Sequence, residues 1–268
     1  MTMEMDVLEL SDRSAKFILS NTTAAFANGL RRAMLADVPT LAIDDVNIYN
    51  NTSVLYDEQL ALRLGLIPLV TSFDEFVPQD ECTCEDGCPA CTVSLTLSVE
   101  ATDDEGRMVY SGDIVSSDPK VQPAEVNIPI IDLKLGQKVV LEGIAHMGYG
   151  RDHAKWQAGV ACGYKNLPVI TIDGCDRCGA CVNVCPRNVL CLGDEYVEVS
   201  DEDLLKCSLC RLCQDACDID AISVTEDKNG FIFTMESDGS YTVNELIINA
   251  VNTIKRKASS MDDILSTL

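Results

Sequence analysis

The chain has 268 residues, of which 47% are hydrophobic, and its 43 acidic residues outnumber its 20 basic residues, which gives a formal net charge of −23. This length is enough to bury a hydrophobic core in one to three domains, so the fold does not depend on cysteine cross-links. The acidic balance repels phosphate, which argues against sequence-independent binding of DNA or RNA by the isolated chain and favours basic protein partners.

The 14 cysteines point to a reducing compartment. The first residues (MTMEMDVLELSDR) lack an apolar run of the kind found in signal peptides, so thiols that bind metal are expected in place of disulfides. No window approaches the roughly 18 to 20 apolar residues that span a bilayer. We therefore expect a cytoplasmic protein without a membrane segment.

The first quarter of the chain predicts two strands and two helices. Residues 7–10 and 16–19 are apolar-rich segments on either side of a turn and are expected to pair as strands. Residues 22–36 carry apolar side chains at helical spacing, and Val38 precedes a proline that ends the run. Residues 56–70 begin with acidic side chains that suit a helix N-terminus and reach a glycine at position 65, where the helix should stop.

A first group of cysteines lies in the segment DECTCEDGCPACT. Four thiols within ten residues, with glycine and proline between them, are able to close a tetrahedral site of the all-thiolate type that suits structural zinc. Free thiols or disulfides are the alternative. The four candidate ligands are Cys82, Cys84, Cys88 and Cys91.

The middle of the chain predicts β-structure and offers no catalytic constellation. The expected strands are residues 92–100, 107–115 and 138–145. The segment 116–129 is rich in turn residues and is expected to be an exposed loop. His146 and His153 are the only histidines, and we assign them structural or surface roles, because no nucleophile with an adjacent base or phosphate-binding glycine loop accompanies them.

A second, larger group of cysteines forms an internal duplication. Two runs share the spacing Cys-x2-Cys-x2-Cys-x3-Cys, and each cysteine of the second run lies 32 residues after its counterpart in the first. Three thiolates two residues apart wrap one face of an iron-sulfur cubane, and the fourth ligates the neighbouring cluster. The predicted [4Fe–4S] ligand sets are Cys175, Cys178, Cys181 and Cys217 for the first cluster, and Cys207, Cys210, Cys213 and Cys185 for the second.

The residues around these cysteines fit a ferredoxin-like unit. Strands are expected at 168–172, 196–199 and 221–225, with a short helix at 201–205. A helix is also expected after each fourth cysteine, with a weaker start in the second copy, where aspartate replaces proline. Cys191 is an extra cysteine and is expected to be a packed free thiol. A pair of zinc sites, or reduced structural cysteines, is the alternative to two clusters.

The end of the chain predicts an amphipathic helix. Thr242 and Glu245 form a capping box at its start. An apolar stripe follows over about three turns. Its members are Val243, Leu246, Ile247, Ala250, Val251 and Ile254. From the periodicity alone, this stripe and that of residues 22–36 either cover a sheet of the same chain or pack against a partner.

Three blocks of the chain resemble a known family. Residues 26–46 (FANGLRRAMLADVPTLAIDDV) resemble the dimerisation motif of the alpha-like subunits of cellular RNA polymerases. Residues 57–69 and 148–161 resemble two further blocks of the archaeal D-type members of this family and of their eukaryotic third-largest-subunit relatives. The spacing from Cys82 to Cys91 is similar to the zinc loop of those eukaryotic relatives, and many archaeal D-type members carry an inserted ferredoxin-like domain.

The resemblance implies an α+β fold with a discontinuous layout. A dimerisation domain would comprise residues 1–45 and 224–268. An inserted, mainly β domain with the four-cysteine loop would comprise 46–164, and the ferredoxin-like domain 165–223. The chain would then hold two [4Fe–4S] clusters and one zinc ion.

The resemblance also implies partners. The polymerase L subunit, which shares the dimerisation fold, would form a heterodimer with this chain, and the other small assembly subunits and the large catalytic subunits would assemble on that platform. The chain itself would contribute no catalytic residue to the archaeal polymerase. The implied interface residues are Phe26, Asn28, Leu30, Arg31, Arg32, Leu246, Ile247, Ala250 and Ile254.

The competing function is an iron-sulfur electron-transfer protein or a redox-enzyme subunit. Paired clusters are common where electrons move, but the cysteine module is a minority of the chain and no flavin or nicotinamide fingerprint accompanies it.

Overall fold

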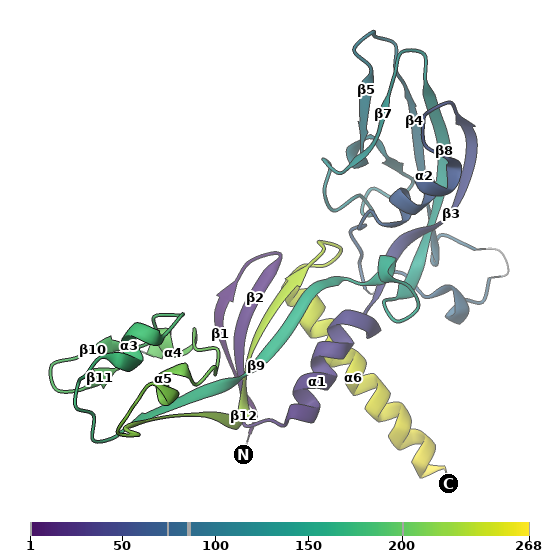
Figure 1. Cartoon of the computed structure of the whole chain (residues 1–268). Coiled ribbons are helices and arrows are strands. Elements are labelled where there is room, and N and C mark those ends of the chain that lie inside the picture. Colours follow the sequence, from purple (N-terminus) through teal and green to yellow (C-terminus); the bar gives the residue numbers. More distant parts are fainter. Residues whose placement is uncertain (1, 74, 85–86, 200, 268) are drawn as a thin grey trace. The chain divides into compact units, whose positions relative to one another are not determined.

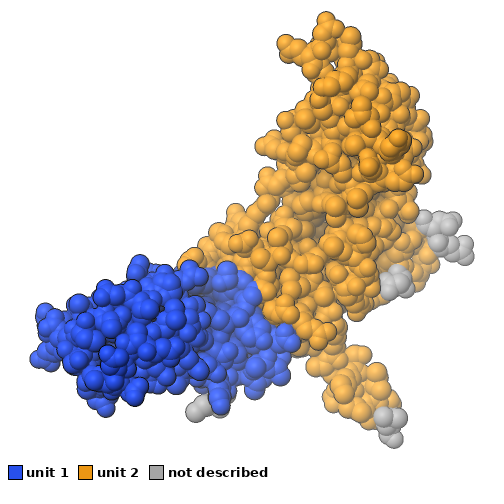
Figure 2. Space-filling model, in the orientation of Figure 1, with its two compact units in different colours: residues 1–8, 16–28, 163–234 blue, residues 9–15, 29–162, 235–268 orange. Residues whose placement is uncertain are grey.

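The computed structural model describes residues 2–73, 75–84, 87–199 and 201–267. The chain divides into two compact units, drawn in different colours in Figure 2. Unit 1 comprises residues 1–8, 16–28 and 163–234, and unit 2 comprises residues 9–15, 29–162 and 235–268. No helix among the described residues is long and apolar enough to cross a membrane.

A four-stranded sheet joins the start of the chain to its later part. Its strand order is β1 (Glu4–Leu10), β2 (Ser14–Ser20), β12 (Ile222–Ser237) and β9 (Gly159–Ile172). The strands predicted at 7–10 and 16–19 are confirmed, and those at 168–172 and 221–225 are parts of much longer strands. Aromatic side chains pack on this sheet: the rings of Phe17 and Phe233 stack with centroids 5.1 Å apart, and Tyr164 contacts Phe233 at 5.1 Å.

The predicted first helix is confirmed, but it ends differently from an ordinary α-helix. α1 spans Ala24–Arg32, and a π-helical segment follows over Ala33–Asp37. The amide of Val38 donates to the carbonyl of Ala33 at 3.2 Å, which closes the wider turn. Pro39 then begins strand β3 (Pro39–Asn51), consistent with the proline stop expected from the sequence.

The C-terminal helix α6 spans Val243–Ser266 and is longer than predicted. The capping box is confirmed: Thr242 Oγ1 accepts from the Glu245 amide at 3.3 Å, and Glu245 Oε2 accepts from the Thr242 amide at 2.9 Å. Lys257 on α6 pairs with Asp37 at 2.8 Å, which fixes the helix against the π-helical segment.

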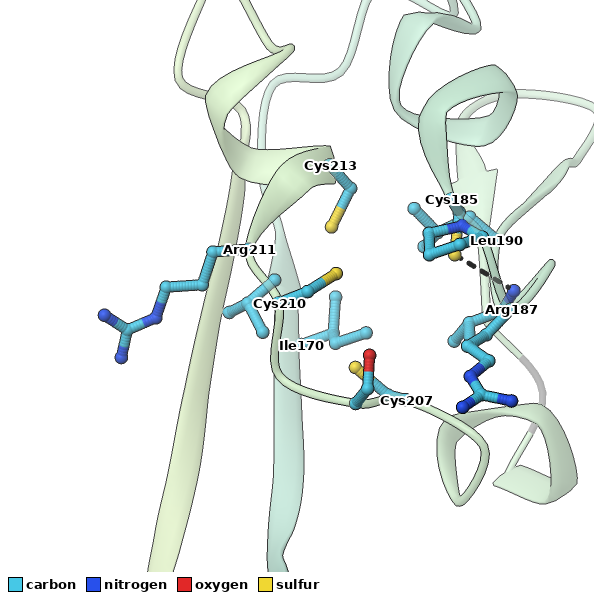
Figure 3. A pocket seen from close by; sticks show the side chains of 12 residues that line it. Ile170, Cys185, Arg187, Leu190, Cys207, Cys210, Arg211 and Cys213 are labelled. Carbon is cyan, nitrogen blue, oxygen red and sulfur yellow. Dashed lines mark hydrogen bonds between the residues drawn. The ribbon is translucent and has the colours of Figure 1, made fainter.

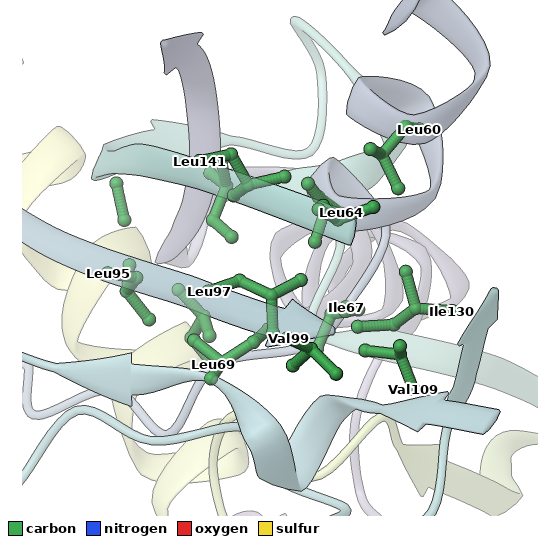
Figure 4. Packing of buried hydrophobic residues seen from close by; sticks show 14 of the residues in the cluster. Leu60, Leu64, Ile67, Leu69, Leu95, Leu97, Val99, Val109, Ile130 and Leu141 are labelled. Carbon is green, nitrogen blue, oxygen red and sulfur yellow. The ribbon is translucent and has the colours of Figure 1, made fainter. Parts of the chain in front are cut away.

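The largest hydrophobic core lies in unit 2, between a second four-stranded sheet and helix α2 (Asp57–Gly65) (Figure 4). The strand order is β3, β8 (Lys138–Tyr149), β4 (Thr92–Glu100) and β6 (Val115–Ser116), with β3 and β4 both antiparallel to β8. Buried residues alternate with half-buried or exposed ones along β4, and with half-buried ones along β8, as expected for strands with one covered face. The predictions of α2, β4 and β8 are confirmed.

The strand predicted over 107–115 is wrong in its extent. The structure has β5 (Arg107–Tyr110), paired with β7 (Pro129–Leu133), and then a short 3₁₀ turn over Ser111–Asp113 before β6. The Asp113 carboxylate accepts from the Tyr110 amide at 2.8 Å and pairs with Arg107 at 2.9 Å. This side-chain cap ends the strand, because it takes the amide that would continue the ladder.

The cysteine-rich part of unit 1 is built from very short elements (Figure 1). The helices are α3 (Ala180–Val184), α4 (Asp201–Leu204) and α5 (Leu212–Asp215), and the hairpin strands are β10 (Cys191–Leu192) and β11 (Val197–Glu198). The short helix predicted at 201–205 and the strand predicted at 196–199 are confirmed. The domain boundaries implied by the resemblance stay a prediction, and strand β9 runs through the boundary proposed at residue 165.

Candidate metal centres

The backbone around the eight repeated cysteines is duplicated in conformation as well as in sequence. Left-handed backbone conformations recur 32 residues apart, although most of the residues that adopt them are not glycine. The pairs are Arg177 and Leu209 (φ 61° and 58°), Gly179 and Arg211 (75° and 62°), and Asn188 and Asp220 (51° and 53°). Two segments with different side chains therefore fold around their cysteines in the same way.

Each predicted ligand set lines a pocket of its own. Cys175, Cys178, Cys181 and Cys217 line one. Cys207, Cys210, Cys213 and Cys185 line the other. Figure 3 shows the labelled sulfurs of the second set around a common space. In both pockets the fourth cysteine comes from the opposite copy of the repeat, as the spacing predicts.

Backbone amides approach the sulfurs in the same pattern in both copies. The amides of Arg177 and Leu209 donate to Cys175 and Cys207 at 3.4 and 3.5 Å. The amides of Val189 and Ala221 donate to Cys185 and Cys217 at 3.4 and 3.2 Å. Such donors stabilise thiolates, and hydrogen bonds to sulfur tune iron-sulfur clusters.

Three of the eight cysteines lie deep in the unit, and one of them, Cys207, is 8% exposed. Cys181 and Cys213 are each 7% exposed, and burial raises the pKa of both thiols. The surrounding apolar core includes Val189, Val197 and Val224. A buried thiolate without a cation is unfavourable, so these residues fit a bound metal centre that would hold the sulfurs deprotonated.

Two details of the sequence prediction for this region are wrong. The helices lie before the fourth cysteine of each run, not after it, because Asn188 and Asp220 adopt left-handed φ and close a turn there. Cys191 is exposed on strand β10 and not packed; its thiol donates to the carbonyl of Glu198 at 3.5 Å. Cys191 does not line either pocket.

The four-cysteine loop differs from both pockets because its sulfurs are close together. The sulfurs of Cys82, Cys84, Cys88 and Cys91 all lie within 4.8 Å of one another. The Cys82–Cys88 and Cys88–Cys91 pairs are each 3.7 Å apart, and Cys84–Cys91 is 3.4 Å. A tetrahedral zinc site with bonds of about 2.3 Å places its sulfurs about 3.8 Å apart, so this loop fits a single ion.

The thiols of this loop also differ in acidity. A backbone hydrogen bond from Cys84 and further bonds from neighbouring thiols lower the pKa of Cys82 to about 7, and burial raises the pKa of Cys91 to about 12. Metal binding would release the remaining protons, because only the thiolate is a ligand.

Comparison with known proteins identifies the family. The family model described as the RNA polymerase Rpb3/Rpb11 dimerisation domain matches residues 16–258. The chain belongs to the Rpb3/Rpb11 dimerisation family. The match runs from strand β2 into helix α6 and so includes both compact units.

Similar curated members of this family are archaeal. The chain is 63% identical to the DNA-directed RNA polymerase subunit Rpo3 of Methanosarcina acetivorans over the whole of both chains. It is 42% identical to the Rpo3 of Archaeoglobus fulgidus, again over both whole chains. It is 42% identical to the Rpo3 of Halobacterium salinarum, covering 97% of this chain and 96% of that one. These relatives carry the name Rpo3 and not the designation D suggested by the resemblance.

Helix α6 of this Rpb3/Rpb11-family chain has two apolar faces. One face is buried within the chain: Leu246 and Ala250 are 0% exposed, so these two predicted interface residues belong to the chain's own core. The other face is half-buried or exposed, and its residues recur at alternating intervals of four and three. They are Ile247, Val251, Ile254, Ala258, Met261 and Leu265. We call this second face the heptad stripe of α6.

The predicted interface residues of α1 are also divided between core and surface. Leu30 is 3% exposed and belongs to the core. Phe26 and Arg31 are half-buried, while Asn28 and Arg32 are exposed. Whether any of these residues contacts a partner stays a prediction.

Both histidines have structural contacts. His146 lies on β8 with its Nε2 3.4 Å from an Asp44 carboxylate oxygen, and its ring is 5.4 Å from that of Trp156. Burial lowers the pKa of His146. His153 Nδ1 accepts from the Lys155 amide at 3.1 Å and so begins a short 3₁₀ turn.

Sequence reasoning missed two features of these sites. The ammonium of Lys165 on β9 donates to the carbonyls of Leu205 and Cys207 at 2.8 and 2.6 Å, next to the second pocket. A single lysine in a strand gives no signal for this contact. The heptad stripe beyond Ile254 did have a signal, because Ala258, Met261 and Leu265 continue the same spacing in the sequence.

Proposed function

We propose that this chain is a non-catalytic assembly subunit of an archaeal DNA-directed RNA polymerase. The observation that carries this proposal is the full-length similarity to Rpo3 subunits, 63% identical over the whole of both chains in one case. In this role the chain pairs with a second protein of the dimerisation fold, the polymerase L subunit. The pair then serves as the platform for the other small subunits and the large catalytic subunits.

The heptad stripe of α6 is the part of the chain best suited to that pairing. Val251 is 43% exposed, Met261 64% and Leu265 56%. Spacing of four and three residues is the pattern with which two helices pack along a seam. A helix of the partner laid along this stripe would remove these apolar side chains from water, and each such side chain contributes on the order of 1 to 2 kcal/mol.

The eight repeated cysteines are proposed to hold two [4Fe–4S] clusters, in the ligand sets given above. When bound, each cluster would supply a redox-active group, but its main effect here would be structural. The helices of this region have only four or five residues, too few to be stable alone. Metal binding would therefore contribute folding free energy to this part of unit 1.

The four-cysteine loop is proposed to hold one zinc ion. Its compact sulfur geometry supports this assignment, and the absence of long secondary structure around the described residues of the loop gives the ion the same stabilising role. Cys91 adjoins strand β4, so an ion held here would tie the loop to the core sheet.

The pairing is tested by co-expressing the chain with the L subunit and measuring recovery of the pair. Val251→Asp places a charge in the heptad stripe at an exposed position, so the isolated chain should fold while the pair is lost, because an unpaired buried carboxylate is strongly unfavourable. Asn252→Asp is the matched control, since it adds the same charge at an exposed position outside the stripe. Equal recovery of both variants would refute the proposed interface.

An electron carrier is the second candidate function, because two pockets lined by four cysteines lie in one unit. The test is a variant with serine at the four ligands of one cluster. An assembly subunit should still pair with the L subunit, with lower stability, whereas an electron carrier would lose electron transfer and would show no polymerase partner in a pull-down.

A further inference from the structure

A basic groove in unit 1 lies beside the second cysteine-lined pocket and shares Arg187 with it. It has a volume of about 450 Å³. Cations from four separate segments line it: Lys16 on β2, Lys165 on β9, Arg187 after Cys185, and Lys206 before Cys207. No carboxylate is among the described residues that line it, although the chain as a whole carries a net charge of −23. The groove therefore concentrates positive charge on an acidic protein.

Two of the four cations are held in place by contacts within the chain, and the four like charges repel one another. The two carbonyls that accept from Lys165 fix its ammonium. Lys206 pairs with Asp203 at 2.7 Å, and Arg187 is exposed. An anionic group in the groove would relieve this repulsion.

We propose that this groove docks an acidic segment of a partner protein. The groove is wide open to solvent, whereas small-molecule sites usually enclose most of the ligand. Tyr164 lies half-buried among the cations, which gives the aliphatic part of a glutamate or aspartate side chain an apolar surface. Four cations on an acidic chain form too small a patch for nucleic acid, whose binding depends on many phosphate contacts.

The proposal rests on the groove alone and does not depend on the polymerase role or on the nature of the metal centres. The contacts would be between charges near the surface. They should therefore affect the choice of partner and the association rate more than the affinity. Binding should weaken as salt is raised, since exposed charge pairs are screened.

The test uses the full, metal-loaded chain and a short glutamate-rich peptide with a fluorescent label, followed by fluorescence anisotropy at physiological salt. Arg187→Glu and Lys16→Glu should each weaken peptide binding by about tenfold or more. Lys134→Glu is the charge-matched control, because Lys134 is an exposed lysine of unit 2, 67% exposed in its side chain, and it should leave binding unchanged. Iron content and circular dichroism of each variant establish that the groove is folded.

Three outcomes would overturn the proposal. One is equal binding of the peptide by Arg187→Glu, Lys16→Glu and Lys134→Glu. Another is displacement of the peptide by millimolar inorganic phosphate, which would indicate a small-anion site. The third is tighter binding of duplex DNA than of the peptide, with the same sensitivity to Arg187→Glu.

Discussion

The two cysteine-lined pockets of unit 1 and the four-cysteine loop of unit 2 offer the same chemical group in different arrangements. In the loop, four sulfurs from ten consecutive residues lie within 4.8 Å of one another. In each pocket, three sulfurs come from one copy of the repeat and the fourth from the other copy. Local spacing alone brings the loop sulfurs together, whereas the pockets exist only when the two copies are folded against each other.

This difference predicts different consequences when a ligand is lost. A cysteine of the pockets lies between two copies of the repeat, so its loss should disturb both copies. A cysteine of the loop should affect the loop and little else. The substitutions below test this contrast, in order of expected effect.

Cys213→Ser should have the largest effect. Cys213 is 7% exposed and lines the second pocket. Its loss should reduce iron from about eight to about four atoms per chain and lower the unfolding temperature of unit 1. Elemental analysis and thermal unfolding under anaerobic conditions measure both. Cys191→Ser is the control, because Cys191 is exposed and outside the pockets; an equal loss of iron in this control would contradict the assigned ligand sets.

Cys88→Ser should remove the zinc and leave the iron. The sulfur of Cys88 lies 3.7 Å from two of its neighbours, so three ligands would remain and the affinity for zinc should fall by orders of magnitude. Elemental analysis of the purified variant reports both metals. Cys162→Ala, at a cysteine outside both groups, should change neither metal. Loss of iron together with zinc would mean that the two kinds of site are not independent.

Lys165→Met should lower the reduction potential of the second cluster by tens of millivolts, because reduction adds negative charge next to a position that has lost a cation. Lys165 bonds to the carbonyl of Cys207, a ligand of this cluster in our assignment. The first cluster provides the internal reference in a redox titration followed by electron paramagnetic resonance. Lys165→Arg keeps the charge and should change the potential little. A shift of both clusters by the same amount would refute the local effect.

The smallest effects on stability should come from Gly179 and Arg211, which have the same left-handed backbone conformation in the two copies of the repeat but different side chains. Gly179 has φ of 75°, and a Cβ added there would meet only ordinary contacts with Leu192, so Gly179→Ala should cost about 1 kcal/mol through backbone strain alone. Arg211 already carries a side chain at φ of 62°, so Arg211→Gly should be neutral or stabilising. Denaturant unfolding of the metal-loaded chain measures the change in the free energy of unfolding for each variant. Destabilisation by both substitutions, or stabilisation by both, would contradict this account.

Much of the site organisation could be predicted from the sequence because spacing determines it. The exchange of Cys185 and Cys217 between the two copies follows from the repeat. The capping box of Thr242 and Glu245 follows from two residue types at a fixed interval. Features that depend on contacts between distant residues could not be predicted, such as the burial of Leu246 within its own chain or the contact of Lys165 with Cys207.

Boundaries were the least predictable part of the fold. The strand predicted over 107–115 is too long, because the Asp113 carboxylate accepts a hydrogen bond from the backbone amide of Tyr110. The pattern of apolar and polar residues in this segment does not predict that hydrogen bond. Helix α6 was predicted too short because its last turns lack a buried face within the chain, and residues 255–267 are all exposed. Their apolar members Ala258, Met261 and Leu265 belong to the heptad stripe that we propose contacts a partner helix.

The most direct test of the proposed contrast between the metal sites is the metal content of the full chain, purified without exposure to air. The account predicts about eight iron atoms and about one zinc ion per chain, together with the visible absorption of iron-sulfur clusters. Zinc in all three sites, or no iron at all, would contradict it.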